Sequence, residues 1–344
     1  MKAFEKPLYP TEGLKRLCNS ALREADVILS TTPQKPSKVI RLATRSDISH
    51  AMVCAGPYSV IEATGAGVHS QNTQRLFFHA SEPLYVLRLR VTPSAEQLSV
   101  ITDFVRAKVG TRYTIAEAIQ AGAGVKVKLS RKQFCSRLVA QAFSSAGIQL
   151  VPDPDYCSPE DLKNSPLLEA INGVTESVDL GLFQNVENTL DVPAYMASIT
   201  NQALVRIRKW DPSIEDMNDT IQFLRRHPEF DMRVHAAMKD AGFLDVCSVE
   251  IGAKTWQYDL KAFRANQQSI EDKRRYCVEL IAEEMVHARP YVVSLANLLE
   301  YLEENNLETF RALADIYEEL ISMLRLRVLI ANHWLSEDKG EGQS

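Results

Sequence analysis

The chain has 344 residues, of which 45% are hydrophobic and 24% charged, and its formal net charge at pH 7 is −5. This length and composition predict a soluble protein of two domains, and the weak negative charge gives no general reason to expect nucleic-acid binding. No apolar run reaches the roughly 18 residues that a membrane span needs, and the N-terminal residues lack the apolar core of a secretory signal. We therefore expect a chain that is cytoplasmic, or exported by a route independent of a signal peptide.

The cysteines are spread along the sequence without a C-x-x-C pair. Zinc sites and dense disulfide frameworks need closely spaced cysteines, so we expect reduced thiols and no metal or other cofactor. The six cysteines are Cys18, Cys54, Cys135, Cys157, Cys247 and Cys277.

Three short segments precede residue 47. Residues 11–24 place three leucines at helical spacing and predict a short amphipathic helix. Residues 26–30 form a short apolar run that ends at Thr-Thr-Pro, which predicts a strand. The basic, proline-containing residues 31–46 are expected to be mostly loop.

A hairpin is predicted next, with strands over residues 48–54 and 58–63 and a turn over residues 55–57. A three-residue turn places Glu62 directly opposite His50, so a carboxylate faces an imidazole across the pair. A two-residue turn shifts the register by one and separates them, which leaves an edge histidine and an unrelated glutamate as the alternative.

A turn, a strand and two helices are predicted between residues 65 and 121. A Gly-Ala-Gly turn at 65–67 precedes a strand over 84–91 and helices over 94–109 and 114–121. Residues 121–126 are glycine-rich but lack the spacing of a phosphate-binding loop, so we interpret them as a flexible connection.

Cys135 lies where the next helix is expected to begin. The helix prediction rests on apolar residues at helical spacing and on a glycine that ends the pattern: Leu138, Val139, Ala142, Phe143 and Gly147. Free backbone N–H groups, the helix dipole and nearby basic side chains favour a thiolate at such a position. The alternative is that Cys135 is a small buried apolar residue.

The remainder is predicted to be largely helical. Ser158 is expected to cap a short helical turn. The helical ranges are 194–210, 213–226, 230–241, 256–268 and 271–335, with a break or kink near Pro290 and an interruption at 305–306. Glu284 and His287 have the spacing of di-metal carboxylate bundles, but the second copy that such a site needs is missing from the sequence.

Together, a cysteine, a histidine and an acid in the first half of the chain form the grouping that thiol catalysis uses. Histidine accepts the thiol proton and later protonates the leaving group, while the acid orients the ring. Backbone N–H groups at the start of the Cys135 helix could stabilise an oxyanion. This grouping predicts acyl-transfer chemistry.

Residues 24–168 also resemble a known family. The motifs are Gly110-Thr111-Arg112-Tyr113, Phe134-Cys135-Ser136-Arg137-Leu138-Val139, Ser49-His50-Ala51, Val60-Ile61-Glu62-Ala63 and the end piece Ser158-Pro159-Glu160-Asp161-Leu162. They are similar to the signatures of NlpC-type papain-like cysteine amidases. Because His50 and Glu62 precede Cys135, the order resembles the circularly permuted YiiX/YaeF-like branch, which is related to lecithin:retinol acyltransferase.

The resemblance implies Cys135 as the nucleophile, His50 as the base and Glu62 as the orienting residue. It also implies that Tyr113 lines the substrate pocket. Arg137 stands where many relatives have glycine, and we interpret it as a substrate-contacting cation that narrows the cleft or favours an anionic substrate.

The sequence therefore predicts an α+β fold: a circularly permuted papain-like catalytic domain with a small antiparallel sheet over residues 1–168, followed by a mainly α-helical domain over 169–344. The expected function is hydrolysis or acyl transfer at an amide or ester bond of an acyl lipid or peptide, through a thioester. Two alternatives are a catalytically silent binding module and an exported toxin that attacks cell-envelope peptide or lipid. The helical half is a candidate surface for a protein partner.

Overall fold

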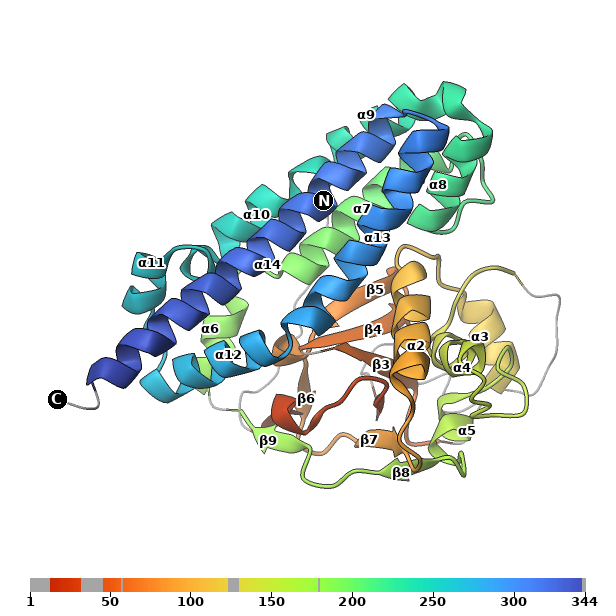
Figure 1. Ribbon diagram of the computed structural model, residues 1–344. Coiled ribbons are helices and arrows are strands. Elements are labelled where there is room, and N and C mark those ends of the chain that lie inside the picture. The colour runs from red at the N-terminus through yellow and green to blue at the C-terminus, as the bar shows by residue number, and fades with distance from the viewer. Residues whose placement is uncertain (1–12, 32–45, 57, 123–129, 179, 342–344) are drawn as a thin grey trace. The chain divides into compact units, whose positions relative to one another are not determined.

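The computed structural model describes residues 13–31, 46–56, 58–122, 130–178 and 180–341 (Figure 1). The chain forms two compact units, Met1–Ala194 and Tyr195–Ser344. Much of the predicted loop over 31–46 and of the connection over 121–126 lies outside the described residues. The α+β fold class is confirmed, because antiparallel sheets form the first unit and helices the second.

A six-stranded antiparallel sheet forms the centre of the first unit, with the strand order β5-β4-β3-β2-β7-β8. The strands are β2 (Val27–Ser30), β3 (His50–Gly56), β4 (Ser59–Thr64), β5 (Gly67–Asn72), β7 (Leu84–Leu89) and β8 (Leu168–Ala170). The predicted strands over 26–30, 48–54, 58–63 and 84–91 are confirmed, whereas β5 follows the Gly-Ala-Gly turn without having been predicted.

A smaller sheet of three strands has the order β6-β1-β9. Its members are β1 (Leu14–Leu17), β6 (Phe77–His79) and β9 (Thr175–Ser177). The predicted helix over 11–24 is therefore wrong. The leucines have helical spacing, but pairing of β1 on both edges satisfies its backbone groups and buries Leu14 and Leu17.

The helices of the first unit are α2 (Ala95–Ala107), α3 (Ile115–Gly122), α4 (Cys135–Ser145), α5 (Pro159–Lys163) and α6 (Leu180–Glu187), with short 3-10 turns η1 (Asn19–Ala21) and η2 (Thr73–Arg75). Three predictions are confirmed: the helices over 94–109 and 114–121 and the helix that begins at Cys135. Ser158 caps α5 by accepting a hydrogen bond from the Asp161 backbone, as predicted.

The hydrophobic core of the first unit lies on both faces of the six-stranded sheet. On one face, Val53 and Ile61 share a cluster with Ile101 of α2 and Phe143 of α4. On the other face, Ile28, Met52 and Val60 pack with Leu17 and Phe78 of the smaller sheet. Because both faces are covered, β3 is buried along its whole length, and this fixes the positions of the side chains that it carries.

The division of the chain between Ala194 and Tyr195 falls later than the predicted domain boundary after residue 168. The strands that follow residue 168 pair with the first unit: β8 with β7, and β9 with β1. These two strands therefore add to the sheets that support the candidate site.

The second unit is helical. It contains α7 (Val192–Ile207), whose first residues belong to the first unit, α8 (Met217–Arg226), α9 (Asp231–Ala241), α10 (Val246–Ala253), α11 (Leu260–Ala265), α12 (Ile270–Ala282), α13 (Glu284–Glu304) and α14 (Glu308–Glu341), with turns η3 (Pro228–Phe230), η4 (Phe243–Asp245) and η5 (Thr255–Gln257). Helices α13 and α14 lie side by side (Figure 1).

The predicted helical ranges of this unit are largely confirmed, with two differences. Helix α10 lies between the predicted ranges 230–241 and 256–268 and was not predicted. Helix α13 continues through Pro290 without a break, and an interruption lies at Glu283, between α12 and α13. The interruption at 305–306 is confirmed, since α13 ends at Glu304 and α14 begins at Glu308.

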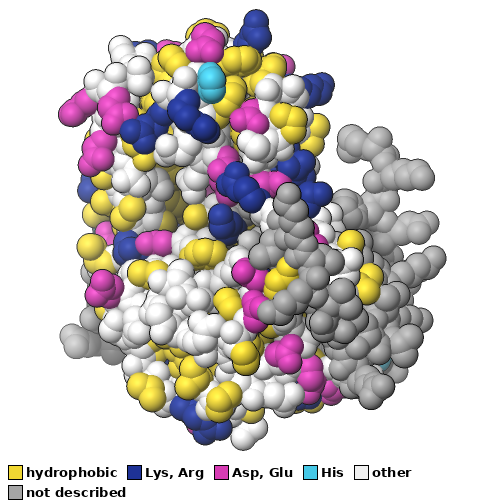
Figure 2. Space-filling model, turned by 90° about the vertical axis from the view of Figure 1, so that its right-hand side faces the viewer, with side chains coloured by type: hydrophobic (Ala, Val, Ile, Leu, Met, Phe, Trp, Pro, Cys, Tyr) yellow, Lys and Arg dark blue, Asp and Glu magenta, His cyan; other side chains and the backbone are white. Residues whose placement is uncertain are grey.

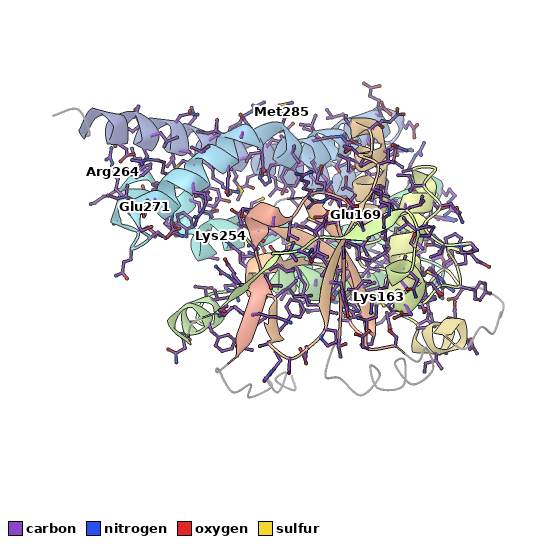
Figure 3. The ribbon with its side chains drawn as sticks, turned by 90° about the horizontal axis from the view of Figure 1, so that it is seen from below. Lys163, Glu169, Lys254, Arg264, Glu271 and Met285 are labelled. Atoms are coloured by element: carbon purple, nitrogen blue, oxygen red, sulfur yellow. The ribbon has the colours of Figure 1, made fainter. Side chains whose placement is uncertain are left out.

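The surface carries charges of both signs. Acidic and basic side chains are interspersed with hydrophobic ones on the face that Figure 2 shows. Met285 of α13 projects outward at the edge of the helical unit (Figure 3) and is largely exposed. Among the described residues, none of the helices combines the length and apolarity that crossing a membrane requires.

Candidate active site

Cys135 is the first residue of α4. Phe134 precedes it in an extended conformation (φ −137°, ψ 163°), and no side chain caps the helix there. The first-turn N–H groups of a helix have no partner within the helix, and they give its N-terminus a partial positive charge. The Cys135 side chain is held in the core beside this end of the helix, since the residue is only 3% exposed.

His50 and Glu62 lie on the paired strands β3 and β4, but not in the predicted register. Glu62 pairs with Met52, and the register shifts between Cys54 and Gly56 at a bulge. The predicted direct pairing of Glu62 with His50 is therefore wrong. The error is two residues, so both side chains stay on the same face, and His50 Nε2 still contacts Glu62 Oε2 as a diagonal neighbour.

Both members of this pair are buried, and each changes the titration of the other. Burial by itself lowers the pKa of His50, but the Glu62 charge and hydrogen bonds to Cys135 and Glu62 raise it well above 6.5. Burial by itself raises the pKa of Glu62, yet the charge and hydrogen bond of His50 hold it far below 4.5. Glu62 is consequently a carboxylate at neutral pH.

The thiol of Cys135 completes the arrangement, because it lies close enough to His50 to raise the pKa of the ring. Because Nε2 of the ring is turned to Glu62, Nδ1 is the nitrogen that remains for the thiol. The Cys135 Sγ also lies 4.0 Å from the backbone carbonyl oxygen of Ser49, next to His50. The structure thus brings together the three residues that the sequence analysis proposed as catalytic.

Two further side chains contact Glu62, and the sequence analysis missed both. His69 and Gln71 lie on β5, where the register places His69 directly opposite Glu62. His69 Nε2 is 3.2 Å from Glu62 Oε1, and Gln71 Nε2 donates a hydrogen bond to the same oxygen. The turn at 65–67 was a usable signal, because a strand that returns from it must run antiparallel to β4.

Tyr113 lies close to the candidate nucleophile. Its backbone pairs with Gln133 just before α4, and its ring packs against the cluster that contains Cys135. Burial and the proximity of Cys135 raise the pKa of the Tyr113 phenol, so it is a neutral hydroxyl at neutral pH. This position agrees with a pocket-lining residue, although contact with substrate stays a prediction.

Arg137 is buried rather than presented on a surface, with 1% of the residue exposed. Its guanidinium pairs with Glu117 at 2.8 Å, donates to the carbonyl oxygens of Lys132 and Asp155, and stacks over the Phe134 ring. These contacts join α4 to α3 and to the loop before α5. They give Arg137 a structural role, and its proposed contact with substrate stays a prediction.

Four other cysteines have environments that suppress reactivity. Burial is the main cause that raises the pKa of Cys54 and Cys247 to about 12 and that of Cys277 to about 11. It also raises the pKa of Cys157, which lies in the loop before α5. A thiol with a raised pKa is a poor nucleophile at neutral pH, so these four residues are unsuited to catalysis.

Histidine and glutamate are residue types that bind metals, and His50, Glu62 and His69 lie close together. Within the part of the chain that the structure describes, no group of three or more His, Cys, Asp or Glu side chains is arranged to hold a metal ion. The two histidines contact different oxygens of one carboxylate, and this geometry joins them through Glu62.

Comparison with known proteins finds similarity in the first unit of the chain. Residues 21–175 match the model of a family described as permuted papain-like amidase enzyme, YaeF/YiiX, C92 family. This segment therefore resembles a permuted papain-like domain. The match spans the elements from β2 to β8, and it confirms the predicted resemblance. It supports a hydrolase activity in general.

Two individual relatives align with the same part of the chain. The probable lipoprotein peptidase YaeF of Escherichia coli strain K12 is 28% identical over 187 residues, which cover 45% of this chain and 67% of the relative. The crystal structure of the metalloprotein YiiX from Escherichia coli O157:H7 aligns over 43% of this chain and 96% of its own, at 15% identity and a TM-score of 0.29.

Proposed function

We propose that this protein is a cysteine-dependent amidase or peptidase in which Cys135 is the nucleophile, His50 the general base and acid, and Glu62 the residue that orients His50. One observation carries the proposal: a single buried imidazole lies beside both other groups, with Nε2 on Glu62 and Cys135 close enough to raise the pKa of the same ring. Thiol acyl transfer uses three groups in this order.

The reaction proceeds in two halves. The Cys135 sulfur attacks the substrate carbonyl carbon while His50 takes the thiol proton; His50 then gives that proton to the leaving nitrogen, and the carbon–nitrogen bond breaks to leave a thioester. Water attacks the thioester while His50 accepts a proton from it. The carbon–sulfur bond then breaks to release the acid, and His50 returns the proton to the sulfur, which restores the thiol. An ester follows the same steps with an alcohol as the leaving group.

The N-terminus of α4 has a second task in this proposal. Each half-reaction passes through a tetrahedral intermediate whose carbonyl oxygen becomes an anion. Because no side chain caps α4, the backbone N–H groups beside Cys135 are suited to donate to that oxygen. The helix dipole adds to the stabilisation at the same place.

For the substrate class, we propose an acylated peptide. The relative YaeF is named a probable lipoprotein peptidase, and a lipid-modified peptide offers both amide and ester bonds to a thiol nucleophile. Acyl transfer uses the same thioester and differs only in the acceptor, which is an amine or alcohol in place of water. The acceptor therefore has to be determined by experiment.

The test uses the full chain with an N-acylated peptide and with a phospholipid, each with and without a primary amine as acceptor. Intact-mass spectrometry should detect an acyl adduct on wild type, and Cys135→Ala should lose the adduct and reduce turnover at least about a thousandfold. Cys54→Ala, which changes another buried cysteine of the same unit, is the matched control and should retain turnover. Equal turnover by Cys135→Ala would rule out the proposed nucleophile.

The products distinguish the remaining alternatives. A free acid in the presence of the amine indicates hydrolysis, whereas an acylated amine indicates an acyltransferase. If neither substrate yields an adduct or product and iodoacetamide labels Cys135 no faster than Cys54, the site is not reactive. The chain is then better explained as a binding module on a papain-like fold.

A further inference from the structure

Glu62 uses its two carboxylate oxygens differently. Oε2 accepts from His50, whereas Oε1 faces His69 at 3.2 Å and accepts from Gln71. The carboxylate is thus shared by two imidazoles that come from the strands on either side of β4. All three side chains are largely buried, with 8% of His50, 4% of Glu62 and 9% of His69 exposed.

The surroundings of His69 favour hydrogen on both of its ring nitrogens. Nδ1 lies 3.0 Å from the Gly67 carbonyl oxygen, and Nε2 faces the Glu62 carboxylate. Both of these oxygens are only acceptors of hydrogen bonds. The Gln71 amide nitrogen carries two hydrogens, of which one is donated to Glu62, and it lies 3.4 Å from Nε2. The Glu62 oxygen is nearer to Nε2, at 3.2 Å, and a nitrogen without hydrogen would be repelled by that carboxylate. A ring that donates from both nitrogens is an imidazolium cation.

The titration of His69 agrees with this geometry. Burial lowers its pKa, but the hydrogen bond and charge of Glu62 and the Gly67 carbonyl together raise it above 6.5, against the opposing charge of His50. The titratable groups that act most strongly on His69 are therefore Glu62 of β4 and His50 of β3. On its other edge, β5 is hydrogen-bonded through Val68 to the backbone of residues 110 and 111.

We infer that His69 is a positioning residue which, held as an imidazolium, takes up part of the Glu62 charge and so limits how firmly His50 retains its proton. The inference rests on the proposed function, because it concerns the base of that reaction. When the thioester is hydrolysed, His50 must be neutral to accept a proton from water. A Glu62 charge that acted on His50 alone would keep the ring protonated to higher pH.

His69→Gln tests the charge separately from the hydrogen bond. A glutamine keeps an N–H donor near Glu62 but removes the cation, so the whole carboxylate charge then acts on His50. We expect the pH profile of kcat to move up by about 0.5–1 pH unit, and kcat at pH 7 to fall about threefold to tenfold. His69→Leu removes the donor as well and should also raise KM by loosening Glu62. His79→Gln, on β6, is the matched control and should change neither.

A second measurement needs no substrate. Proton–carbon NMR of the ring Cε1–H groups follows the seven histidines of the chain through a pH titration. His69 should be an imidazolium at pH 7 in wild type, and the midpoint of His50 should rise by about 0.5–1 unit in His69→Gln. A neutral His69 ring in wild type at pH 7 overturns the inference even if every variant fails to fold.

The two measurements also separate this inference from the proposed function. An unchanged His50 midpoint in His69→Gln overturns the inference, whatever the enzyme does. If Cys135→Ala retains turnover, the proposed function fails, while the NMR titration still decides the charge of His69. A purely structural role for His69 predicts a loss of thermal stability in His69→Gln with no shift in either pH profile, and this result would also overturn the inference.

Discussion

The pairing of His50 with Glu62 stabilises the protein within a definite range of pH. The pKa of Glu62 is lowered in the fold, so its contribution is present above about 4.5 and is lost as the pH falls through the folded value. The pKa of His50 is raised, so its contribution is full below about 6.5 and is lost as the pH rises through the folded value. The pair therefore contributes most between these two limits.

Glu62→Gln should consequently destabilise the first unit most in mildly acidic solution. We expect a loss of about 2 kcal/mol in the free energy of unfolding near pH 5.5, because a charged hydrogen bond is replaced by a neutral one, and a shrinking difference as the pH rises above 6.5. This difference in the free energy of unfolding is measured by urea unfolding, with hydrogen exchange of peptides from β3 and β4 as the signal. A difference that is the same at all pH values contradicts this account.

The control for that series is a surface glutamate in the same unit. Glu169 of β8, labelled in Figure 3, lies 3.4 Å from Arg90, and both side chains are about half exposed. Exposed pairs of this kind contribute roughly 0–1 kcal/mol, so Glu169→Gln should leave the stability nearly unchanged at every pH.

The candidate catalytic residues Cys135, His50 and Glu62 could be predicted from the sequence, but the register of the Glu62 strand and the contact of Glu62 with His69 could not. The register error at Glu62 arose at the bulge between Cys54 and Gly56, where Gly56 has a φ of 143° that no pattern of hydrophobicity reveals. The predicted contact between His50 and Glu62 is nevertheless present, because a register error of two residues keeps each side chain on the same face of the sheet. His69 was missed because its burial comes from tertiary packing, and the polar sequence of β5 gives no sign of it.

Among the elements, α4 depends on an ion pair that joins it to α3. Arg137 is inside the unit and Glu117 is its charged partner, with 1% and 11% of the side chains exposed. Burial raises the pKa of Glu117, but hydrogen bonds from Ser130 and Arg137 together with the Arg137 charge lower it overall, so the pair is ionised. Removing one partner would leave the other charge buried without compensation.

Arg137→Met should therefore destabilise the first unit by about 3–5 kcal/mol, and the double variant Arg137→Met with Glu117→Gln should recover most of that loss. Urea unfolding monitored by hydrogen exchange in α3 and α4 measures both. A direct role in substrate binding predicts a different pattern, in which Arg137→Lys raises KM while stability hardly changes. That outcome would restore the interpretation of Arg137 as a substrate contact.

The elements that could be predicted are those whose own sequence determines them. Helices α2 and α4 have a continuous apolar face, and β7 is a long apolar strand, so local pattern and tertiary environment agree. Strand β1 has only four residues and exists because β6 and β9 pair with it on both sides. Its partners lie about 60 and 160 residues away along the chain, and short-range spacing therefore gave the wrong element.

At the scale of the whole molecule, the hydrophobic clusters follow the division into two units. The cluster around α4 contains only residues before position 169, and the largest cluster of the second unit contains only residues after position 202. A unit with its own core can unfold as a separate step. All three tryptophans, Trp210, Trp256 and Trp334, lie in the second unit, so tryptophan fluorescence reports on that unit alone.

A pair of matched core variants tests this independence. Phe143 of α4 and Phe310 of α14 are both fully buried, one in each unit, and truncation of either to alanine should cost about 3–5 kcal/mol in its own unit. Phe143→Ala should lower the urea midpoint of hydrogen exchange in residues 135–145 and leave the tryptophan transition where it is in wild type. Phe310→Ala should move the tryptophan transition and leave exchange in residues 135–145 unchanged. If either variant moves both transitions by the same amount, the two units unfold together, and the candidate active site then depends on the helical unit for its stability.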